Sequence, residues 1–241
     1  GIATIEFYHP ASNSLPAKIL TELAAAIDKA GQDERVKVIV LQSAGTGAFC
    51  AGASFDELTN IQTETEGLKF FSGFANVINA MRKCPKFIIG RIQGKCVGGG
   101  VGLAAAVDYA IATEKCEVKL SELAVGIGPF VVGPAIERRI GTSAFSHLSI
   151  DASSWRTSDW AKRKGLFAEM HSTMENMDEA VNRMSISLSN SNPEAMKEMK
   201  KVFWKGTEHW DELLKEQAAI SGRLVLSDFT KRAIEKFKKK K

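Results

Sequence analysis

Apolar and polar residues follow two different periods in the first third of the chain. Residues 2–8 alternate between apolar and polar, which predicts a half-buried β-strand. Ile19, Leu23 and Ile27 recur four residues apart, which predicts a helix with one apolar face. The run 36–41 is almost entirely apolar and β-branched, as in a strand buried on both faces. The sequence therefore predicts strand, helix and strand in that order.

The same succession continues to about residue 120. A helix is predicted over 67–83 and a short small-residue helix over 103–107. Strands are predicted at 87–92, 109–113 and 118–120. Strands that alternate with helices are typical of an α/β core with crossover connections.

Beyond residue 133 the pattern becomes helical, and we expect no further strand. The predicted helices are 134–140, 143–148, 158–164, 177–188, 193–204 and one final helix around 207–236. This change of character divides the chain into two predicted parts, a core over residues 1–185 and a C-terminal helical region over residues 186–241.

Composition and charge exclude several classes of protein. Of the 241 residues, 44% are hydrophobic and 25% are charged, as in ordinary globular domains. No apolar run approaches the ~20 residues of a membrane-spanning helix, so no membrane partner is expected. The net charge of +4 is concentrated in residues 231–241, which hold seven basic side chains and one acidic side chain. A nucleic-acid binder spreads its basic residues over a face, so we expect no nucleic acid either.

The cysteines and histidines indicate neither a disulfide framework nor a metal site. The four cysteines are far apart and form no CxxC pair, which predicts reduced thiols and a cytoplasmic location. The four histidines are equally scattered and show no metal-ligand spacing, so no metal is expected.

Two glycine-rich loops and one carboxylate carry the candidate chemistry. Residues 49–54 (Phe-Cys-Ala-Gly-Ala-Ser) follow one predicted strand, and residues 98–102 (Gly-Gly-Gly-Val-Gly) follow another. Without bulky side chains, a ligand can approach the backbone N–H groups of such loops. Two loops that aim N–H groups at one oxygen form an oxyanion hole. Glu122 follows a short strand, where partial burial would raise its pKa towards that of a general base.

Each of these features also has an alternative interpretation. Glycine clusters often mark tight packing of a helix on a strand, and a single glutamate often caps a helix or lies on the surface. Residues 100–105 match GxGxxA, the fingerprint of a dinucleotide-binding unit and hence of a nicotinamide-dependent dehydrogenase. However, the match lies far from the opening strand and lacks a suitably spaced acidic residue.

Several segments together resemble the enoyl-CoA hydratase/isomerase (crotonase) family in order and spacing. They are residues 49–53, 98–100, 120–123 and 126–129, with the opening segment 5–15 and the closing segment 228–237. The resemblance thus covers nearly the whole chain. It implies an α/β crotonase-like spiral of ββα units with two near-perpendicular sheets and the acyl-CoA site within residues 1–185. It also implies that residues 186–241 pack the chain into a homotrimer or a hexamer, a dimer of trimers.

The resemblance also implies roles for individual residues. The backbone N–H groups of Ala53 and Gly99 would form the oxyanion hole, and Glu122 would be the catalytic acid/base. The implied positions along the substrate and its CoA moiety are Ser12, Ser14, Ala51, Ser54, Phe55, Gly98, Gly102, Ser121, Pro129 and Phe130. Because coenzyme A arrives as part of an acyl-CoA substrate, no separate cofactor is expected.

The sequence departs from the family pattern at three places. Gly102 stands where hydratases carry a second glutamate, and we expect it to leave room for a larger acyl group, while Phe130 would narrow or reshape the pocket. Asp56 stands where a lysine is common, which makes residues 236–241 a candidate replacement for binding CoA phosphates. The alternative for this tail is a solvated chain end.

With Glu122 as the single carboxylate, the expected enzyme is a lyase or isomerase of fatty-acid-type metabolism. Such an enzyme hydrates an enoyl-CoA or, as the absence of a second glutamate favours, shifts its double bond. Two alternatives remain open: an acyl-CoA decarboxylase that does not hydrate, and a catalytically silent protein that binds CoA thioesters.

Overall fold

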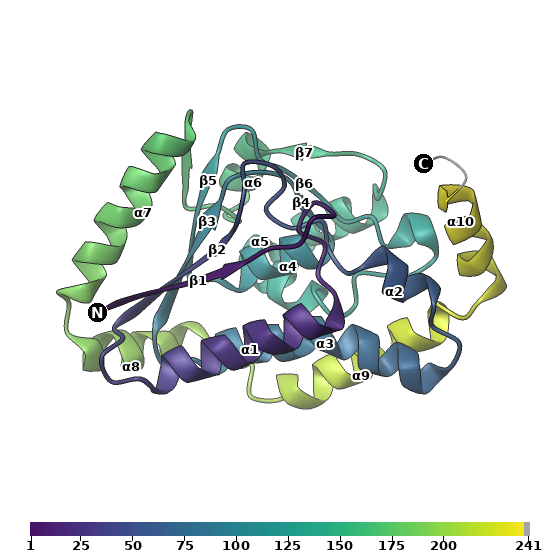
Figure 1. Cartoon of the computed structure of the whole chain (residues 1–241), viewed down its shortest axis with the longest axis horizontal. Helices are drawn as coiled ribbons and strands as arrows, with labels where there is room; N and C mark the ends of the chain where they lie inside the picture. Colours follow the sequence, from purple (N-terminus) through teal and green to yellow (C-terminus); the bar gives the residue numbers. More distant parts are fainter. Residues whose placement is uncertain (239–241) are drawn as a thin grey trace.

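The structure, a computed structural model, describes residues 1–238 and contains one five-stranded parallel sheet (Figure 1). Its strands, in spatial order, are β1 (Ile2–Phe7), β2 (Val38–Ser43), β3 (Phe87–Ile92), β5 (Tyr109–Thr113) and β8 (Glu169–His171). Parallel neighbours need crossover connections, and helices supply most of them here. The predicted α/β core is confirmed.

A second, three-stranded sheet carries the glycine-rich segments. It consists of β4 (Cys96–Val97), β6 (Glu117–Lys119) and β7 (Arg156–Thr157), with β4 parallel and β7 antiparallel to β6. An isolated bridge pairs Cys50 with Cys96, and the Val97 N–H donates to the Cys50 carbonyl at 2.9 Å. The two predicted loops therefore lie side by side although almost fifty residues separate them.

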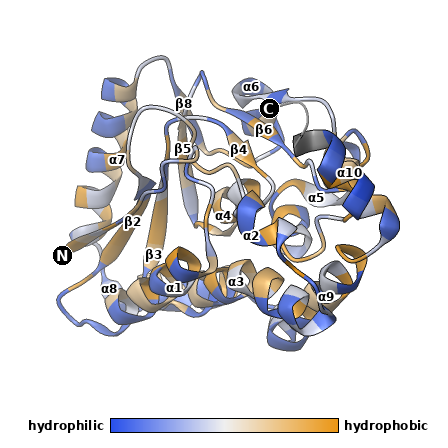
Figure 2. Cartoon of the chain, turned by 45° about the vertical axis from the view of Figure 1, so that its right-hand side comes forward, coloured by the Kyte–Doolittle hydropathy of each residue, from blue (hydrophilic) through white to orange (hydrophobic). Residues whose placement is uncertain are grey.

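The central strands β2 and β3 are buried on both faces, as the apolar run of β2 predicts, whereas the edge strand β1 is mostly half-buried or exposed. Val38 and Val40 face α7 (Met174–Ser189), whereas Ile39 and Leu41 face the main core beneath α1 (Ala17–Gln32) and α3 (Glu64–Lys83). This division follows from the two-residue period of a strand. Figure 2 shows these strands as apolar ribbons between helices that turn polar faces outward.

The remaining helices surround the small sheet and the lower side of the core. They are α2 (Phe55–Thr59), α4 (Gly99–Ala106), the 3₁₀ turn η1 (Leu123–Val125), α5 (Gly133–Ile150), α6 (Ser158–Arg163), α8 (Pro193–Phe203), α9 (Trp210–Leu224) and α10 (Asp228–Lys238). α9 lies along α3 at very short range, because a Cβ atom on Gly67 would stand 2.6 Å from the Gly222 Cα. Within residues 1–238, none of these helices combines the length and apolar character needed to span a bilayer.

The structure corrects several predicted elements. The part after residue 133 contains two strands, β7 and β8, which the sequence did not reveal because they are only two and three residues long and mostly polar, with half-buried or exposed side chains. The helix predicted around 207–236 is two helices, since the chain turns at Ser227, whose Oγ accepts from the Thr230 N–H at 3.3 Å. The expected interruption between 140 and 143 is confirmed as a kink at Gly141, with φ of 78°.

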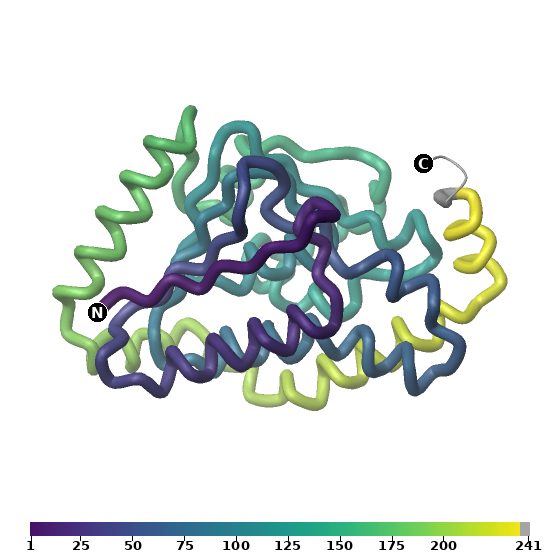
Figure 3. Tube along the Cα trace, in the orientation of Figure 1, coloured from purple at the N-terminus to yellow at the C-terminus, as the bar shows by residue number. Residues whose placement is uncertain are grey.

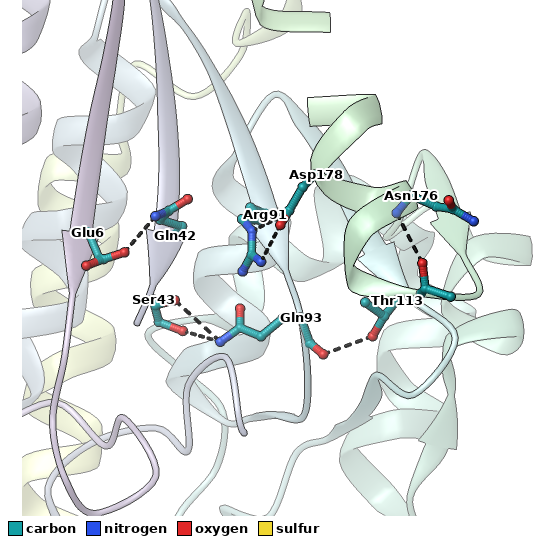
Figure 4. A network of polar contacts seen from close by, with 9 residues as sticks. Glu6, Gln42, Ser43, Arg91, Gln93, Thr113, Asn176 and Asp178 are labelled. Atoms are coloured by element: carbon teal, nitrogen blue, oxygen red, sulfur yellow. Dashed lines mark hydrogen bonds and ion pairs between the residues drawn. The ribbon is translucent and has the colours of Figure 1, made fainter. Parts of the chain in front are cut away.

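Polar contacts hold the sheet to α7 on the face away from the small sheet (Figure 4). Arg91 donates to both carboxylate oxygens of Asp178, and Gln42 donates to Glu6 at 2.6 Å. A groove of about 380 Å³ runs along this network. The first residue of the chain lies beside the end of α7, at the opposite end of the molecule from α10 (Figure 3).

Candidate active site

A cavity of about 880 Å³ opens where the small sheet meets α2, α3 and α10. Its lining contains most of the residues that the sequence singled out: Ser12, Ser14, Ala51, Ala53, Ser54, Phe55, Gly98, Gly99, Ser121 and Glu122. These residues come from four separate stretches of the chain, so the fold gathers into one place what the sequence shows as scattered motifs.

Glu122 brings a carboxylate into this cavity without a partner for one of its oxygens. Among residues 1–238, its Oε2 atom is buried and accepts no hydrogen bond. Burial disfavours the charged form and raises the pKa of Glu122 to about 7, against a small opposing effect of its own backbone N–H. The carboxyl group therefore titrates in the neutral pH range instead of the acidic range.

Gly98 makes the space for this carboxylate. Its φ of +51° is a conformation that a side chain disfavours, and a Cβ atom there would stand 2.7 Å from Glu122 Oε1. The Gly98 N–H donates to the Lys119 carbonyl at 2.9 Å, which fixes the start of the loop against β6. A glycine is therefore required here by both backbone and space.

The next two glycines are packed against other parts of the core. A Cβ atom on Gly99 would lie 2.2 Å from the Phe74 ring, and one on Gly100 would lie 2.2 Å from the Cys50 carbonyl oxygen. The tight-packing interpretation of the cluster is thus correct, and it does not compete with a site. Close packing on Phe74 and Cys50 is what holds the N-terminus of α4 at the cavity wall.

Within residues 1–238, two backbone N–H groups that line the cavity with Glu122 donate no hydrogen bond. The bridge between Leu15 and Ala53 uses the N–H groups of Leu15 and Ser54, so the Ala53 N–H lies outside this ladder. Gly99 is the first residue of α4, where an N–H has no acceptor within the helix. The two loops touch, because a Cβ atom on Gly52 would lie 3.6 Å from the Gly99 nitrogen.

Two polar residues that sequence reasoning missed hold the first loop in place. Asn13 is buried in the left-handed region (φ 55°), and its side-chain amide donates to the carbonyls of Ala44 and Ala48. Glu57 accepts from the Ala17 N–H at 2.9 Å and so caps α1. The turn composition around Asn13 was the available signal, since asparagine tolerates this backbone conformation.

Three predicted site residues, Gly102, Pro129 and Phe130, are absent from the lining of this cavity. A Cβ atom on Gly102 would lie 2.5 Å from Val132 Cγ1, so Val132 occupies the space that was expected to hold a larger acyl group. The Phe130 ring packs against Gly128, at 2.5 Å from the position of a Cβ atom there. The expected effects of Gly102 and Phe130 on the acyl pocket therefore stay predictions.

The far wall of the cavity is apolar and was not predicted. It consists of Leu58, Phe70, Phe71, Ala124, Val125, Ile127, Phe229 and Ala233. Phe229 and Ala233 belong to α10, which reaches the site within the same chain. α10 is held there by η1, because Gly126 has both Thr230 and Phe229 at contact distance. Residues 239–241 of the predicted basic tail lie outside the described residues, whereas Arg232 and Lys236 line the cavity.

Neither metal nor thiolate chemistry is suggested by the described part of the chain. No group of three or more acidic, histidine or cysteine side chains within residues 1–238 is arranged to hold a metal ion. All four cysteines are free and buried, and burial raises the pKa of the Cys50 thiol to about 12. The glycines of the GxGxxA match lie inside α4, not at a turn between strand and helix.

The fold and the arrangement of the two glycine-rich loops define a family of proteins. The sequence profile of the enoyl-CoA hydratase/isomerase family matches residues 1–240, and the chain belongs to that family. It is 30% identical over 202 residues to human mitochondrial methylglutaconyl-CoA hydratase, covering 81% of this chain and 58% of the human protein. It is 30% identical over 135 residues to human mitochondrial 3-hydroxyisobutyryl-CoA hydrolase, covering 54% of this chain and 35% of that one. The matches thus span less than two thirds of either relative.

Solved structures confirm the crotonase fold. The enoyl-CoA hydratase of Bacillus halodurans superposes with a TM-score of 0.89 at 23% identity, over 98% of this chain and 96% of that one. An enoyl-CoA hydratase from Mycobacterium avium gives a TM-score of 0.88 at 22% identity, over 100% and 92% of the two chains. At such identities the agreement concerns the fold alone.

Proposed function

We propose that this protein acts on an enoyl-CoA thioester, with Glu122 as the only acid/base and the N–H groups of Ala53 and Gly99 as the oxyanion hole. The observation that carries the proposal is a buried Glu122 oxygen with no partner within residues 1–238, in one cavity with the Ala53 and Gly99 N–H groups, which donate no hydrogen bond in that range. A pKa of about 7 lets the same group accept and return a proton at neutral pH.

Double-bond isomerisation follows from this arrangement. Glu122 removes a proton from the carbon chain, and the negative charge spreads onto the thioester oxygen held by Ala53 and Gly99. The protonated Glu122 then returns the proton to a different carbon, so the double bond moves and the mass is unchanged. The other carboxylate that lines the cavity, Asp56, is exposed, which favours isomerisation over the two-carboxylate activation of water.

The two sides of the cavity suit the two halves of such a substrate. The serines at 12, 14 and 54 and the backbone at Ala51 offer polar groups to the CoA moiety, as the family resemblance implies. The apolar wall around Phe70, Phe71 and Ile127 offers a surface for the hydrocarbon of the acyl group. Because both open onto the loop at Ala53, the thioester carbonyl sits between them in this proposal.

The quaternary structure and location remain predictions. A homotrimer or hexamer would cover exposed apolar side chains of α8 such as Met199, Val202 and Phe203. Light scattering on the purified protein distinguishes these assemblies from a monomer. We retain a cytoplasmic location as the expectation from the four reduced cysteines.

The test is a Glu122→Gln substitution assayed on a 3-enoyl-CoA and on crotonyl-CoA, with products weighed by mass spectrometry. We expect the parent to shift the double bond without a change in mass, and the variant to lose about 10²–10⁴-fold in kcat. Asp56→Asn is the matched control and should stay within about threefold, because Asp56 is exposed. A gain of one water mass by the parent would assign hydration instead, and a Glu122→Gln variant of nearly parental activity would refute the assigned role.

A further inference from the structure

Trp155 lies between two lysines on the small sheet. The Nζ atom of Lys95 stands 4.5 Å from the centre of the indole ring, and that of Lys119 stands 5.2 Å from it. β6 and β7 pair antiparallel, with Glu117 opposite Thr157 and Val118 opposite Arg156. Lys119 ends β6 and Trp155 directly precedes β7, so this pairing brings the backbones of the two residues to the same end of the small sheet.

The two lysines differ in what else they meet. Lys95 forms an ion pair with Glu117 at 3.1 Å and is not part of the cavity lining. Lys119 and Trp155 both line the cavity. Among the described residues, no carboxylate lies within 4.0 Å of the Lys119 ammonium, so its charge is balanced by no acidic side chain. The indole face attracts the Lys119 ammonium group but accepts no more than part of its hydrogen-bonding capacity. The remaining N–H donors of the ammonium group are therefore available to a ligand.

The backbone of Lys119 is tied to the loop that holds Glu122. The Lys119 carbonyl accepts from the Gly98 N–H, and a Cβ atom on Gly98 would stand 2.7 Å from Glu122 Oε1. Val97, which pairs with Lys119 across β4 and β6, also lines the cavity. The strand that carries Lys119 thus borders the same cavity as Glu122, while its ammonium group lies beside the Trp155 ring.

We propose that Lys119 and Trp155 form an anion-binding subsite for a second charged group of the substrate, apart from the thioester oxygen. The group is an oxyanion, either a phosphate of the CoA moiety or a free carboxylate on the acyl group. Lys119 supplies the charge and hydrogen-bond donors, and the Trp155 ring limits the directions in which the ammonium can point. This proposal rests on the acyl-CoA function proposed above, which does not itself assign a partner to Lys119.

The experiment compares Lys119→Gln with its matched control Lys95→Gln in steady-state kinetics on an acyl-CoA substrate. We expect Lys119→Gln to raise KM roughly tenfold with kcat within about twofold, because a charged hydrogen bond to the substrate is lost away from the reacting atoms. Lys95→Gln should change KM less than twofold. Lys119→Arg keeps the charge and should recover most of the affinity, and thermal unfolding checks that each variant folds.

Thioesters of pantetheine, which lack the CoA phosphates, identify the source of the anion. If the phosphate is bound, the tenfold effect disappears with an uncharged acyl-pantetheine. If an acyl carboxylate is bound, the effect persists with a dicarboxylic acyl-pantetheine and disappears when the acyl group of the CoA ester is uncharged. An equal effect on an uncharged acyl-pantetheine would mean that Lys119 only shapes the cavity, and this would overturn the proposal, as would parental KM values throughout.

Failure of the subsite and failure of the proposed function give different results. If the parent enzyme turns over acyl-CoA and the two variants Lys119→Gln and Lys95→Gln have the same KM, the subsite proposal is refuted and the proposed function stands. A parent protein that neither turns over nor binds any acyl-CoA or CoA removes both. Binding of CoA itself is followed by tryptophan fluorescence, with Trp155→Phe to show whether the signal comes from this ring.

Discussion

Two carboxylates lie near opposite ends of α4, and they differ in their hydrogen bonding. Asp108 follows α4, and its side chain is 9% exposed. Its oxygens accept from the Ile88 N–H at 2.8 Å, from Lys200 Nζ at 2.6 Å and from Trp204 Nε1 at 3.2 Å. Glu122, at the other end, has a buried oxygen with no partner among residues 1–238.

This difference in hydrogen bonding assigns a structural role to Asp108 and leaves Glu122 available to a substrate. Every polar contact of Asp108 is made within the chain, and these contacts tie α8 to the end of the large sheet. A group in such a network has little freedom to exchange protons with a ligand. Glu122 keeps an open acceptor and a pKa of about 7, which lowers stability but leaves the group available to a substrate.

The largest expected effect is a loss of stability when the fully hydrogen-bonded carboxylate, Asp108, is removed. Asp108→Ala removes the partner of Lys200, whose side chain is 3% exposed, and leaves a buried ammonium group unpaired. We expect a loss of about 3–5 kcal/mol in the free energy of unfolding, with activity per folded molecule unchanged. Urea denaturation followed by tryptophan fluorescence measures the loss.

The control for this prediction is Asp211→Ala. Asp211 is also paired with Arg82 and Lys83, but its side chain is 47% exposed, so we expect a loss of at most about 1 kcal/mol. Equal losses for the two variants would show that burial does not decide the contribution of these pairs.

The next largest effect is a loss of kcat when the space that Gly98 leaves for the Glu122 carboxylate is filled. Gly98→Ala adds a Cβ atom 2.7 Å from Glu122 Oε1 at a φ of +51°, so the carboxylate must move. We expect kcat to fall by about 10²-fold, since small displacements of catalytic groups are costly. Enzyme kinetics with circular dichroism as a check on folding measures this effect.

Gly206→Ala separates backbone strain from displacement of the carboxylate. Gly206 has a φ of +85° and no atom within 4 Å of its Cβ position, so the substitution brings strain alone. We expect a modest loss of stability and unchanged kcat. If Gly98→Ala kept parental kcat, the role of Gly98 in making room for Glu122 would have to be abandoned.

The two carboxylates also show what the sequence is able to reveal. Glu122 stands within a few residues of a strand and a glycine-containing loop, so local pattern and family resemblance both point to it. The partners of Asp108 lie 92 and 96 residues away, on a helix whose sequence shows only an apolar face, and no spacing rule connects them. Local motifs were predictable, whereas pairings made by the fold were not.

The surroundings of the site show the same limit. Gly102 and Phe130 were assigned from their positions in a family pattern, whereas the packing of Val132 beside Gly102 and of Phe130 on Gly128 is visible only in the folded chain. The three-residue strand β8 was missed because its place beside β5 comes from backbone pairing and not from an apolar run.

A smaller effect is expected on stability when Glu122 becomes neutral. The folded pKa of about 7 lies above the usual value near 4.5, so the folded state holds this proton more tightly than the unfolded state does. The wild-type protein therefore loses stability as pH rises from about 4.5 to 7, and Glu122→Gln does not. We expect the variant to be more stable by roughly 1–3 kcal/mol at pH 8, with the difference falling away near pH 4.5. Denaturation curves at both pH values test this; a difference independent of pH would contradict it.

The last prediction concerns the pH dependence of the reaction itself, which needs no substitution. Because Glu122 must be ionised to accept the first proton, kcat/KM should be constant above about pH 7 and fall by about tenfold per unit below it. If the pKa of Glu122 were near its ordinary value of 4.5, no such fall would occur between about pH 5.5 and 7. A kcat/KM profile that is flat down to pH 5 would therefore show that Glu122 is not the catalytic base, even though it lines the cavity.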